Sequence, residues 1–64
     1  MNKSGNENRS VRNTKKKLQD GLLTLMQKKH INDITVKELT ELVDVNRGTF
    51  YFHYSDVFDL LYQI

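Results

Sequence analysis

The chain has 64 residues and no cysteine, so it allows one small domain and excludes stabilisation by disulfide bonds. The first ten positions are polar apart from Met1, and no apolar run approaches the roughly 20 residues that a membrane span needs. We therefore expect a cytoplasmic protein without a signal peptide or membrane segment. The net charge of +2 is divided unevenly, because eight basic and two acidic residues precede His30 and two basic and six acidic residues follow it. A basic first half favours a polyanionic partner, with a merely solvated surface as the alternative.

The first predicted helix follows a polar segment. Residues 1–12 are almost without apolar side chains, so we expect a flexible basic tail there. From residue 13 onward the apolar residues recur at helical spacing and predict a helix near 14–29. Its apolar stripe consists of Leu18, Leu22, Leu25 and Met26. Gly21 within it indicates either a close approach of another helix or simple tolerance of glycine.

Three consecutive lysines fall in the first turn of this predicted helix. Lys15, Lys16 and Lys17 would lie where the positive end of the helix macrodipole disfavours cations by a few tenths of a kcal/mol each. A phosphate backbone beside the helix start would favour them there. The alternative is that they only add solubility.

Capping signals predict the second helix. Thr35 and Glu38 have the spacing of a capping box, in which the threonine hydroxyl accepts from the backbone N–H of residue 38 and the glutamate reaches back. Ile34 and Leu39 take the positions of a hydrophobic staple around that cap. We therefore expect a helix at 36–43.

Capping residues for two further helices follow soon after residue 43. Asn46 can cap a helix at 47–53, and Asp56 can start a further helix at 57–64. The short connection between the helices at 36–43 and 47–53 forces a sharp bend, where Asp44 tolerates a left-handed backbone. These elements predict an all-α fold of three helices plus the start of a fourth, with a helix-turn-helix at about 35–54.

The predicted core collects the apolar faces of the four helices. It consists of Leu18, Leu22, Leu25, Met26, Val36, Leu39, Val43, Val45, Phe50, Tyr54, Leu60 and Leu61. The helix at 57–64 is apolar around most of its circumference, whereas packing on one small core needs a single stripe. We therefore expect the chain to be part of a longer protein, with this helix facing something outside the core.

The segment from Asn46 to Tyr54, NRGTFYFHY, contains no acid although acids flank it. If Phe50 and Tyr54 face the core, the remaining side chains suit a nucleic acid: arginine can bond guanine edges or phosphates, threonine offers a hydroxyl, and exposed aromatics can pack on thymine methyls. Gly48 would let the backbone come close to DNA. The alternative is that Tyr51 and Phe52 are core residues of a larger protein.

The stretch Ile34 to Leu60, ITVKELTELVDVNRGTFYFHYSDVFDL, resembles the DNA-binding domain of TetR-type (tetracycline-repressor-like) regulators, and the resemblance extends over about 12–64. It implies that the helix at 47–53 enters the major groove and that Lys37 meets a phosphate. The resemblance also implies that six residues of this helix face DNA: Arg47, Gly48, Thr49, Tyr51, Phe52 and His53. Together with Lys15 and Lys16, they form the predicted DNA-binding set.

The resemblance also implies a wider organisation. Residues 13–56 form the DNA-binding domain, and 57–64 begin a linker helix to a C-terminal domain absent from this chain. That domain dimerises and often binds a small effector, so a homodimer on a palindromic operator is expected, as a repressor or an activator. The chain departs from the family pattern at three positions: His30 and Asp44 replace glycines, and Val57, after Asp56, replaces a lysine that contacts phosphate. The basic tail can compensate for the missing contact.

Two other classes of function remain for comparison. A protein-interaction module could keep the helix-turn-helix shape and use the aromatic helix to bind another protein. An enzyme is not expected, because His30 and His53 lie far apart in sequence without cysteine or clustered carboxylates, and no glycine-rich phosphate loop is present. The sequence therefore predicts neither cofactor nor metal.

Overall fold

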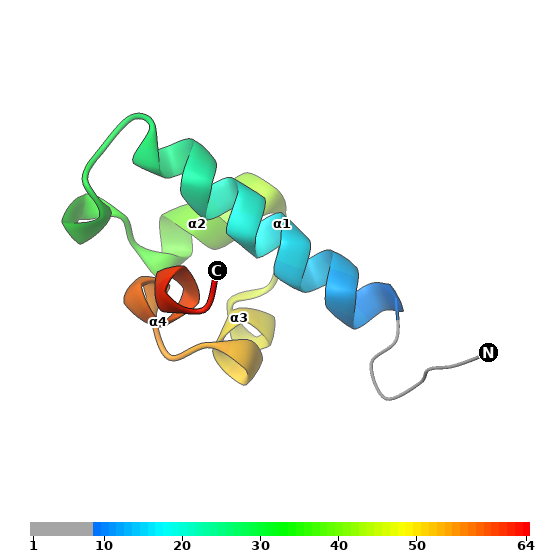
Figure 1. Cartoon of the computed structure of the whole chain (residues 1–64). Helices are drawn as coiled ribbons and strands as arrows, with labels where there is room; N and C mark the ends of the chain where they lie inside the picture. The colour runs from blue at the N-terminus through cyan, green and yellow to red at the C-terminus, as the bar shows by residue number, and fades with distance from the viewer. Residues whose placement is uncertain (1–8) are drawn as a thin grey trace.

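A computed structural model of the protein describes residues 9–64. These residues form four α-helices and one short 3-10 helix, and they contain no strand. The bounds are α1 Arg9–Met26, η1 Ile31–Asp33, α2 Val36–Val43, α3 Arg47–His53 and α4 Val57–Tyr62. Helix α1 packs against α2 and α4, and α2 packs against α3 (Figure 1). The predicted all-α fold is confirmed, and α2 and α3 have the predicted bounds.

Helix α1 differs from the prediction at both ends. It begins at Arg9 instead of residue 14, and it ends at Met26 instead of residue 29. The expected tail at 1–12 is therefore wrong for residues 9–12, while residues 1–8 lie outside the described part of the chain. Val11 explains the earlier start, because it is half-buried and lies seven residues before Leu18, on the same helix face. The Thr14 hydroxyl also donates to the Ser10 carbonyl oxygen at 2.9 Å.

Gly21 marks the point where α1 meets α2. A Cβ atom at Gly21 would collide with Cγ1 of Val43 and lie 3.0 Å from Cδ1 of Leu39. The close approach of a second helix is therefore confirmed, and simple tolerance of glycine does not explain this position. Because interiors are packed as densely as organic crystals, a larger residue here would push α1 away from α2.

The α2–α3 connection is fixed by local hydrogen bonds. The Thr35 hydroxyl accepts from the Glu38 N–H at 3.0 Å, as predicted. The reach-back half of the capping box is wrong, since both Glu38 carboxylate oxygens accept from Lys29 Nζ, at 2.9 and 3.0 Å. Asp44 adopts the predicted left-handed conformation (φ 58°, ψ 49°). The next N–H, that of Val45, donates to the Thr40 carbonyl oxygen at 2.9 Å, which closes the end of α2.

One hydrophobic core joins all four α-helices. Its buried members are Leu18, Leu22, Leu25, Ile34, Leu39, Phe50, Tyr54, Val57 and Leu60. The other predicted members lie at the edge of the core, partly buried: Met26, Val36, Val43, Val45 and Leu61. The prediction missed Ile34, which lies in an irregular segment where periodicity gives no signal, and Val57. The buried Thr40 hydroxyl is satisfied by the Val36 carbonyl oxygen at 2.8 Å.

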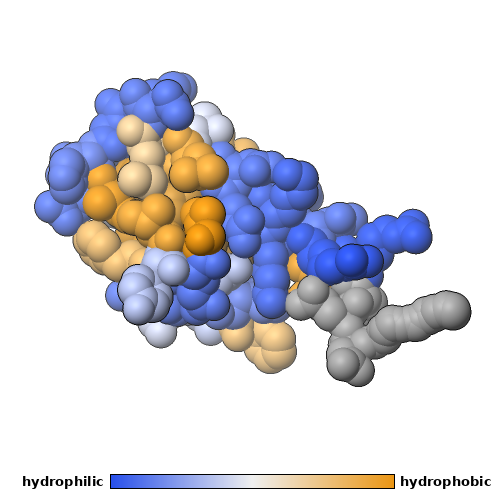
Figure 2. All heavy atoms as spheres, viewed as in Figure 1, coloured by the Kyte–Doolittle hydropathy of each residue, from blue (hydrophilic) through white to orange (hydrophobic). Residues whose placement is uncertain are grey.

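Helix α4 has more apolar surface than the core covers. Asp56 caps it by accepting from the Asp59 N–H at 2.8 Å. Phe58, Tyr62 and Ile64 remain exposed, and Figure 2 shows an apolar area over α4 and beside it. Part of this apolar segment therefore faces away from the core, and its packing against a further part of a longer protein stays a prediction. The predicted helix at 57–64 is two residues shorter, ending at Tyr62.

Candidate nucleic-acid interface

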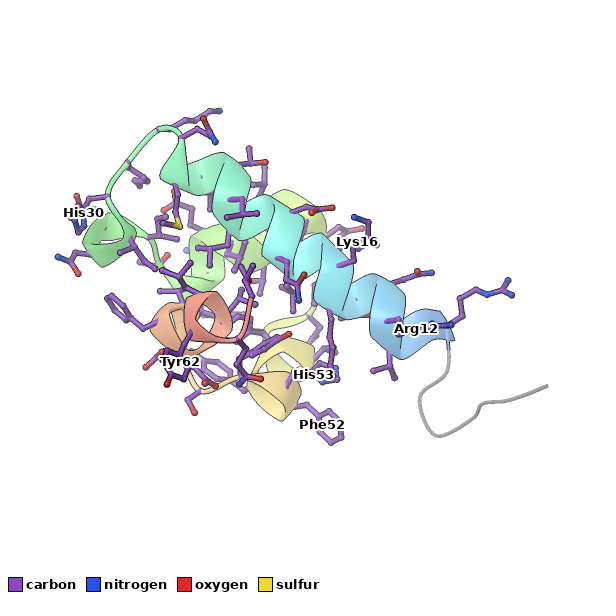
Figure 3. All side chains as sticks on the ribbon, viewed as in Figure 1. Arg12, Lys16, His30, Phe52, His53 and Tyr62 are labelled. Carbon is purple, nitrogen blue, oxygen red and sulfur yellow. The ribbon has the colours of Figure 1, made fainter. Side chains whose placement is uncertain are left out.

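Helix α3 divides its side chains between the core and the outside. Phe50 is completely buried and Tyr54, directly after the helix, is nearly so. Phe52 is 82% exposed and points away from the body of the molecule (Figure 3). This division confirms the prediction that Phe50 and Tyr54 form the inner face. The remaining α3 residues are exposed or, for His53, half-buried: Arg47, Gly48, Thr49, Tyr51, Phe52 and His53.

Aromatic contacts involve three of these side chains. The Tyr51 ring meets the buried Phe50 ring edge to face, with 5.4 Å between centroids. The His53 ring meets the Phe52 ring in the same way at 5.1 Å. Such pairs favour defined orientations. Neither Tyr51 nor Phe52 belongs to the core formed by the described residues. Their burial in the core of a larger protein stays an alternative prediction.

Gly48 has a structural role that the sequence reading missed. Its N–H donates to Asn46 Oδ1 at 2.6 Å and so completes the cap of α3. A Cβ atom at Gly48 would lie 2.9 Å from that same oxygen. A larger residue at this position would therefore require the capping side chain of Asn46 to shift, whether or not a ligand approaches. A glycine two residues after a capping asparagine is the sequence signal that could have indicated this role.

The outer side of α3 carries positive charge without an acid. Asp44 and Asp56 are the nearest acidic residues along the chain, and they lie at the two turns that flank α3. Within residues 9–64, the Arg47 guanidinium takes part in no ion pair. Its five N–H donors are therefore available to an external acceptor.

Lys37 lies on the neighbouring helix. It is exposed in the first turn of α2, and α2 packs directly on α3. In the described residues its ammonium group has no carboxylate partner. Lys37 and α3 therefore belong to one helix-turn-helix unit, although the structure records no direct contact between Lys37 and the exposed α3 side chains.

The lysines of α1 do not lie where the sequence reading placed them. Because α1 begins at Arg9, Lys15, Lys16 and Lys17 fall beyond its first turn, where the macrodipole effect has decayed. The electrostatic argument for these lysines is therefore wrong. Lys16 pairs with Asp20 at 3.3 Å on an exposed surface, and Lys15 is half-buried. Their binding to DNA remains a prediction.

His30 and Val57, two departures from the family pattern, both have structural roles. His30 Nδ1 accepts from the Asn32 N–H at 3.1 Å and caps η1. Val57 is buried in the core, so a lysine there would lose an apolar contact. In the part of the chain that the structure describes, no group of three histidine, cysteine or acidic residues could hold a metal ion. None of the described helices is long and apolar enough to span a membrane.

The fold is that of an all-α helix-turn-helix domain, and one comparison with known proteins agrees. The chain is 34% identical over 47 residues to the uncharacterized HTH-type (helix-turn-helix) transcriptional regulator YxbF of Bacillus subtilis (strain 168). The aligned region covers 73% of this chain but only 12% of that protein. No protein-family model matches the chain, and no solved structure matches it. The similarity supports a helix-turn-helix regulator and does not identify a subtype.

Proposed function

We propose that this chain is the DNA-binding unit of a transcriptional regulator and that α3 enters the major groove of duplex DNA. The observation that carries the proposal is the outer face of α3, which offers one unpaired guanidinium, hydroxyls and exposed rings, with no acid from Val45 to Ser55. Such a face is unfavourable in water and complementary to base edges and phosphates. The chain therefore acts by binding rather than by catalysis.

Each residue of the interface has a role in this proposal. Arg47 and Thr49 read base edges, because an arginine fork matches guanine and a threonine offers both a hydroxyl and a methyl group. Phe52 packs on a thymine methyl or a sugar. Phosphate oxygens are bound by Tyr51, His53, Lys37, Lys15 and Lys16. Gly48 keeps the start of α3 free of a side chain, so that the duplex can approach closely.

We further propose that the regulator is of TetR type. The proposal rests on the NRGTFYFHY segment, which coincides with the cap, body and end of α3, and on the regulator name of the Bacillus relative. It implies a cytoplasmic homodimer, joined through a C-terminal domain outside this chain, that binds a palindromic operator as repressor or activator. A small effector would bind in that other domain.

A second candidate is a protein-interaction module with the same shape. Two observations favour it. A buried valine stands at position 57, where a phosphate-binding lysine would otherwise stand, and Phe58 and Tyr62 of α4 are exposed together with Ile64 just after it. The absence of acids on α3 favours DNA as the partner of that helix. The exposed apolar residues of α4 can bind a different partner, so they do not argue against DNA binding by α3.

Salt dependence separates the two candidates. A duplex site is first selected from random sequences with the intact protein, and its affinity is then measured at several salt concentrations. Binding to phosphates releases counterions, so the affinity should fall steeply with salt, and Lys37→Ala should reduce the slope of log K against log salt by about 0.9. Failure to select any duplex, or affinity insensitive to salt, would favour the protein-interaction module.

A further inference from the structure

A groove of about 330 Å³ lies between α1 and α2. Figure 1 shows α1 running across α2, against which it packs. Four of the lining residues come from α1 and two from α2: Lys17, Asp20, Gly21, Thr24, Leu42 and Val43. Sites for small molecules have volumes of about 300–1,000 Å³ and mostly apolar walls. The groove is therefore large enough for a small ligand, and none of its lining residues belongs to the predicted DNA-binding set.

The close approach of the two helices gives the groove an apolar floor. Because Gly21 has no side chain, Val43 lies directly against the backbone of α1 and closes the floor. Leu42 forms an apolar wall, and its side chain is 52% exposed although it lines the groove. From Lys17 to Thr24 the groove follows one face of α1 over seven residues, or about 10 Å. Its shape therefore suits an extended apolar chain.

The charged residues of the groove leave one cation without a partner. The Asp20 carboxylate is within 3.3 Å of Lys16 Nζ, so its charge is already balanced. The Thr24 hydroxyl donates to the Asp20 carbonyl oxygen at 2.9 Å. Lys17 is exposed and takes part in no ion pair within residues 9–64. Its ammonium group has three N–H donors and no acceptor, so an anionic group complements this end of the groove.

We propose that the α1–α2 groove binds a small aliphatic carboxylate. Lys17 binds the carboxylate group, and the aliphatic chain lies over Gly21 and Val43 beside Leu42, where it removes apolar surface from water. This site is separate from the outer face of α3 and does not depend on the proposed DNA binding. It would add a small-molecule site to the helix-turn-helix unit itself, because α2 belongs to both.

The test uses three probes that share one chain and differ in the head group: octanoate, octylamine and octanol. Each is titrated into the intact protein while the backbone amide signals are followed by NMR. An open groove and a ligand of about ten heavy atoms imply dissociation constants on the order of millimolar. Octanoate should shift the amide signals of the groove residues and should bind more tightly than the other two probes.

Three variants then assign the head group and the chain. Lys17→Gln should weaken octanoate binding by about two- to fivefold, the range expected for an exposed ion pair. Leu42→Gln should weaken it by about threefold or more, because the apolar wall is lost. Lys28→Gln is the matched control and should change nothing, since Lys28 is exposed outside the groove and has no ion pair in the described residues. Circular dichroism should show unchanged helicity in all three, because the substituted residues are exposed.

Several results would overturn the proposal. Octylamine binding as tightly as octanoate would assign the head group to Asp20, and equally tight binding of octanol would show that charge plays no part. Equal losses for Lys17→Gln and Lys28→Gln would mean that only the overall charge matters. Octanoate that shifts none of the groove amide signals would exclude the site. Each of these results leaves the proposed DNA binding intact, because that proposal is tested on duplexes and through other residues.

Discussion

Helices α3 and α4 are built alike. Each is short and is capped by one side chain, Asn46 for α3 and Asp56 for α4. Each buries part of its apolar surface and exposes aromatic rings. On α3, Phe52 is 82% exposed, and on α4, Tyr62 is 89% exposed. Exposed aromatic residues alone therefore do not distinguish the two surfaces.

The two helices differ in the charges around those rings. On α3 the neighbours are Arg47 and Thr49, without an acid, whereas α4 is capped by Asp56 and carries Asp59 in its first turn. A polyanion would be attracted to the first surface and repelled by the second. The second surface suits an apolar partner instead. The charged neighbours, more than the aromatic residues, therefore indicate which kind of partner suits each helix.

The largest expected effect is a loss of stability on substituting the inner face of α3, compared with the outer face. Phe50 is fully buried and Phe52 is exposed, so Phe50→Ala should lower the free energy of unfolding by about 3–5 kcal/mol. Phe52→Ala should change it by less than about 0.5 kcal/mol and should instead weaken binding to a selected duplex. Denaturant unfolding measures the first effect and a binding titration the second. A large loss of stability for Phe52→Ala would place that ring in a core and contradict its proposed role.

A smaller effect compares the caps of the two helices. Asn46 Oδ1 accepts from Gly48 at 2.6 Å, and Asp56 Oδ1 accepts from Asp59 at 2.8 Å. Replacing either residue by alanine should reduce the free energy of unfolding by about 1 kcal/mol. Only Asn46→Ala should also weaken DNA binding, because it loosens the start of α3. Thermal unfolding and duplex titration of both variants test this difference, and equal losses of DNA affinity would remove the distinction between α3 and α4.

The smallest effect concerns the pH dependence of the α4 cap. The Ser55 N–H donates to the Asp59 carboxylate at 2.9 Å, and Gln63 Nε2 donates to it at 3.1 Å; these bonds lower the pKa of Asp59 below its ordinary value. A lowered folded-state pKa means that the carboxylate stabilises the fold above the unfolded pKa, and that this contribution disappears as pH falls through the folded pKa.

Asp59→Asn should therefore lower the melting temperature slightly at neutral pH. The difference from wild type should shrink as the pH falls below about 4, the ordinary aspartate range. Melting curves of both proteins across the acid range provide the measurement. A difference independent of pH would show that the charge of Asp59 does not contribute.

Local signals predicted the helix-turn-helix well. The caps at Thr35 and Asn46 each depend on one side chain and a backbone group two or three residues away, so the sequence contains all that is needed. The left-handed conformation of Asp44 followed from the short connection, which forces a sharp bend, and from the tolerance of aspartate for that conformation. The aromatic segment at 46–54 similarly predicted which rings face outward, because helical spacing separates Phe50 from Phe52.

Features that depend on distant contacts were missed. Glu38 does not reach back to its own cap because Lys29, nine residues earlier, is within 2.9 Å of its carboxylate. A single half-buried residue, Val11, continues the stripe of α1, and one apolar residue among polar neighbours is too weak a signal for a helix. Ile34 is buried in an irregular segment, and the predicted core omitted it because no helical period indicates a face there, although the staple position had paired it with Leu39.

The central claim, that the outer face of α3 reads DNA sequence, is tested most directly by Arg47→Ala in the intact protein. Affinities of wild type and variant are measured on a selected duplex and on a random duplex at the same salt concentration. If Arg47 contacts a base edge, the variant should lose about 1–3 kcal/mol on the selected site and much less on random DNA. The preference for one base pair of the site should also relax. Equal losses on both duplexes would contradict the claim and reassign Arg47 to the phosphate backbone.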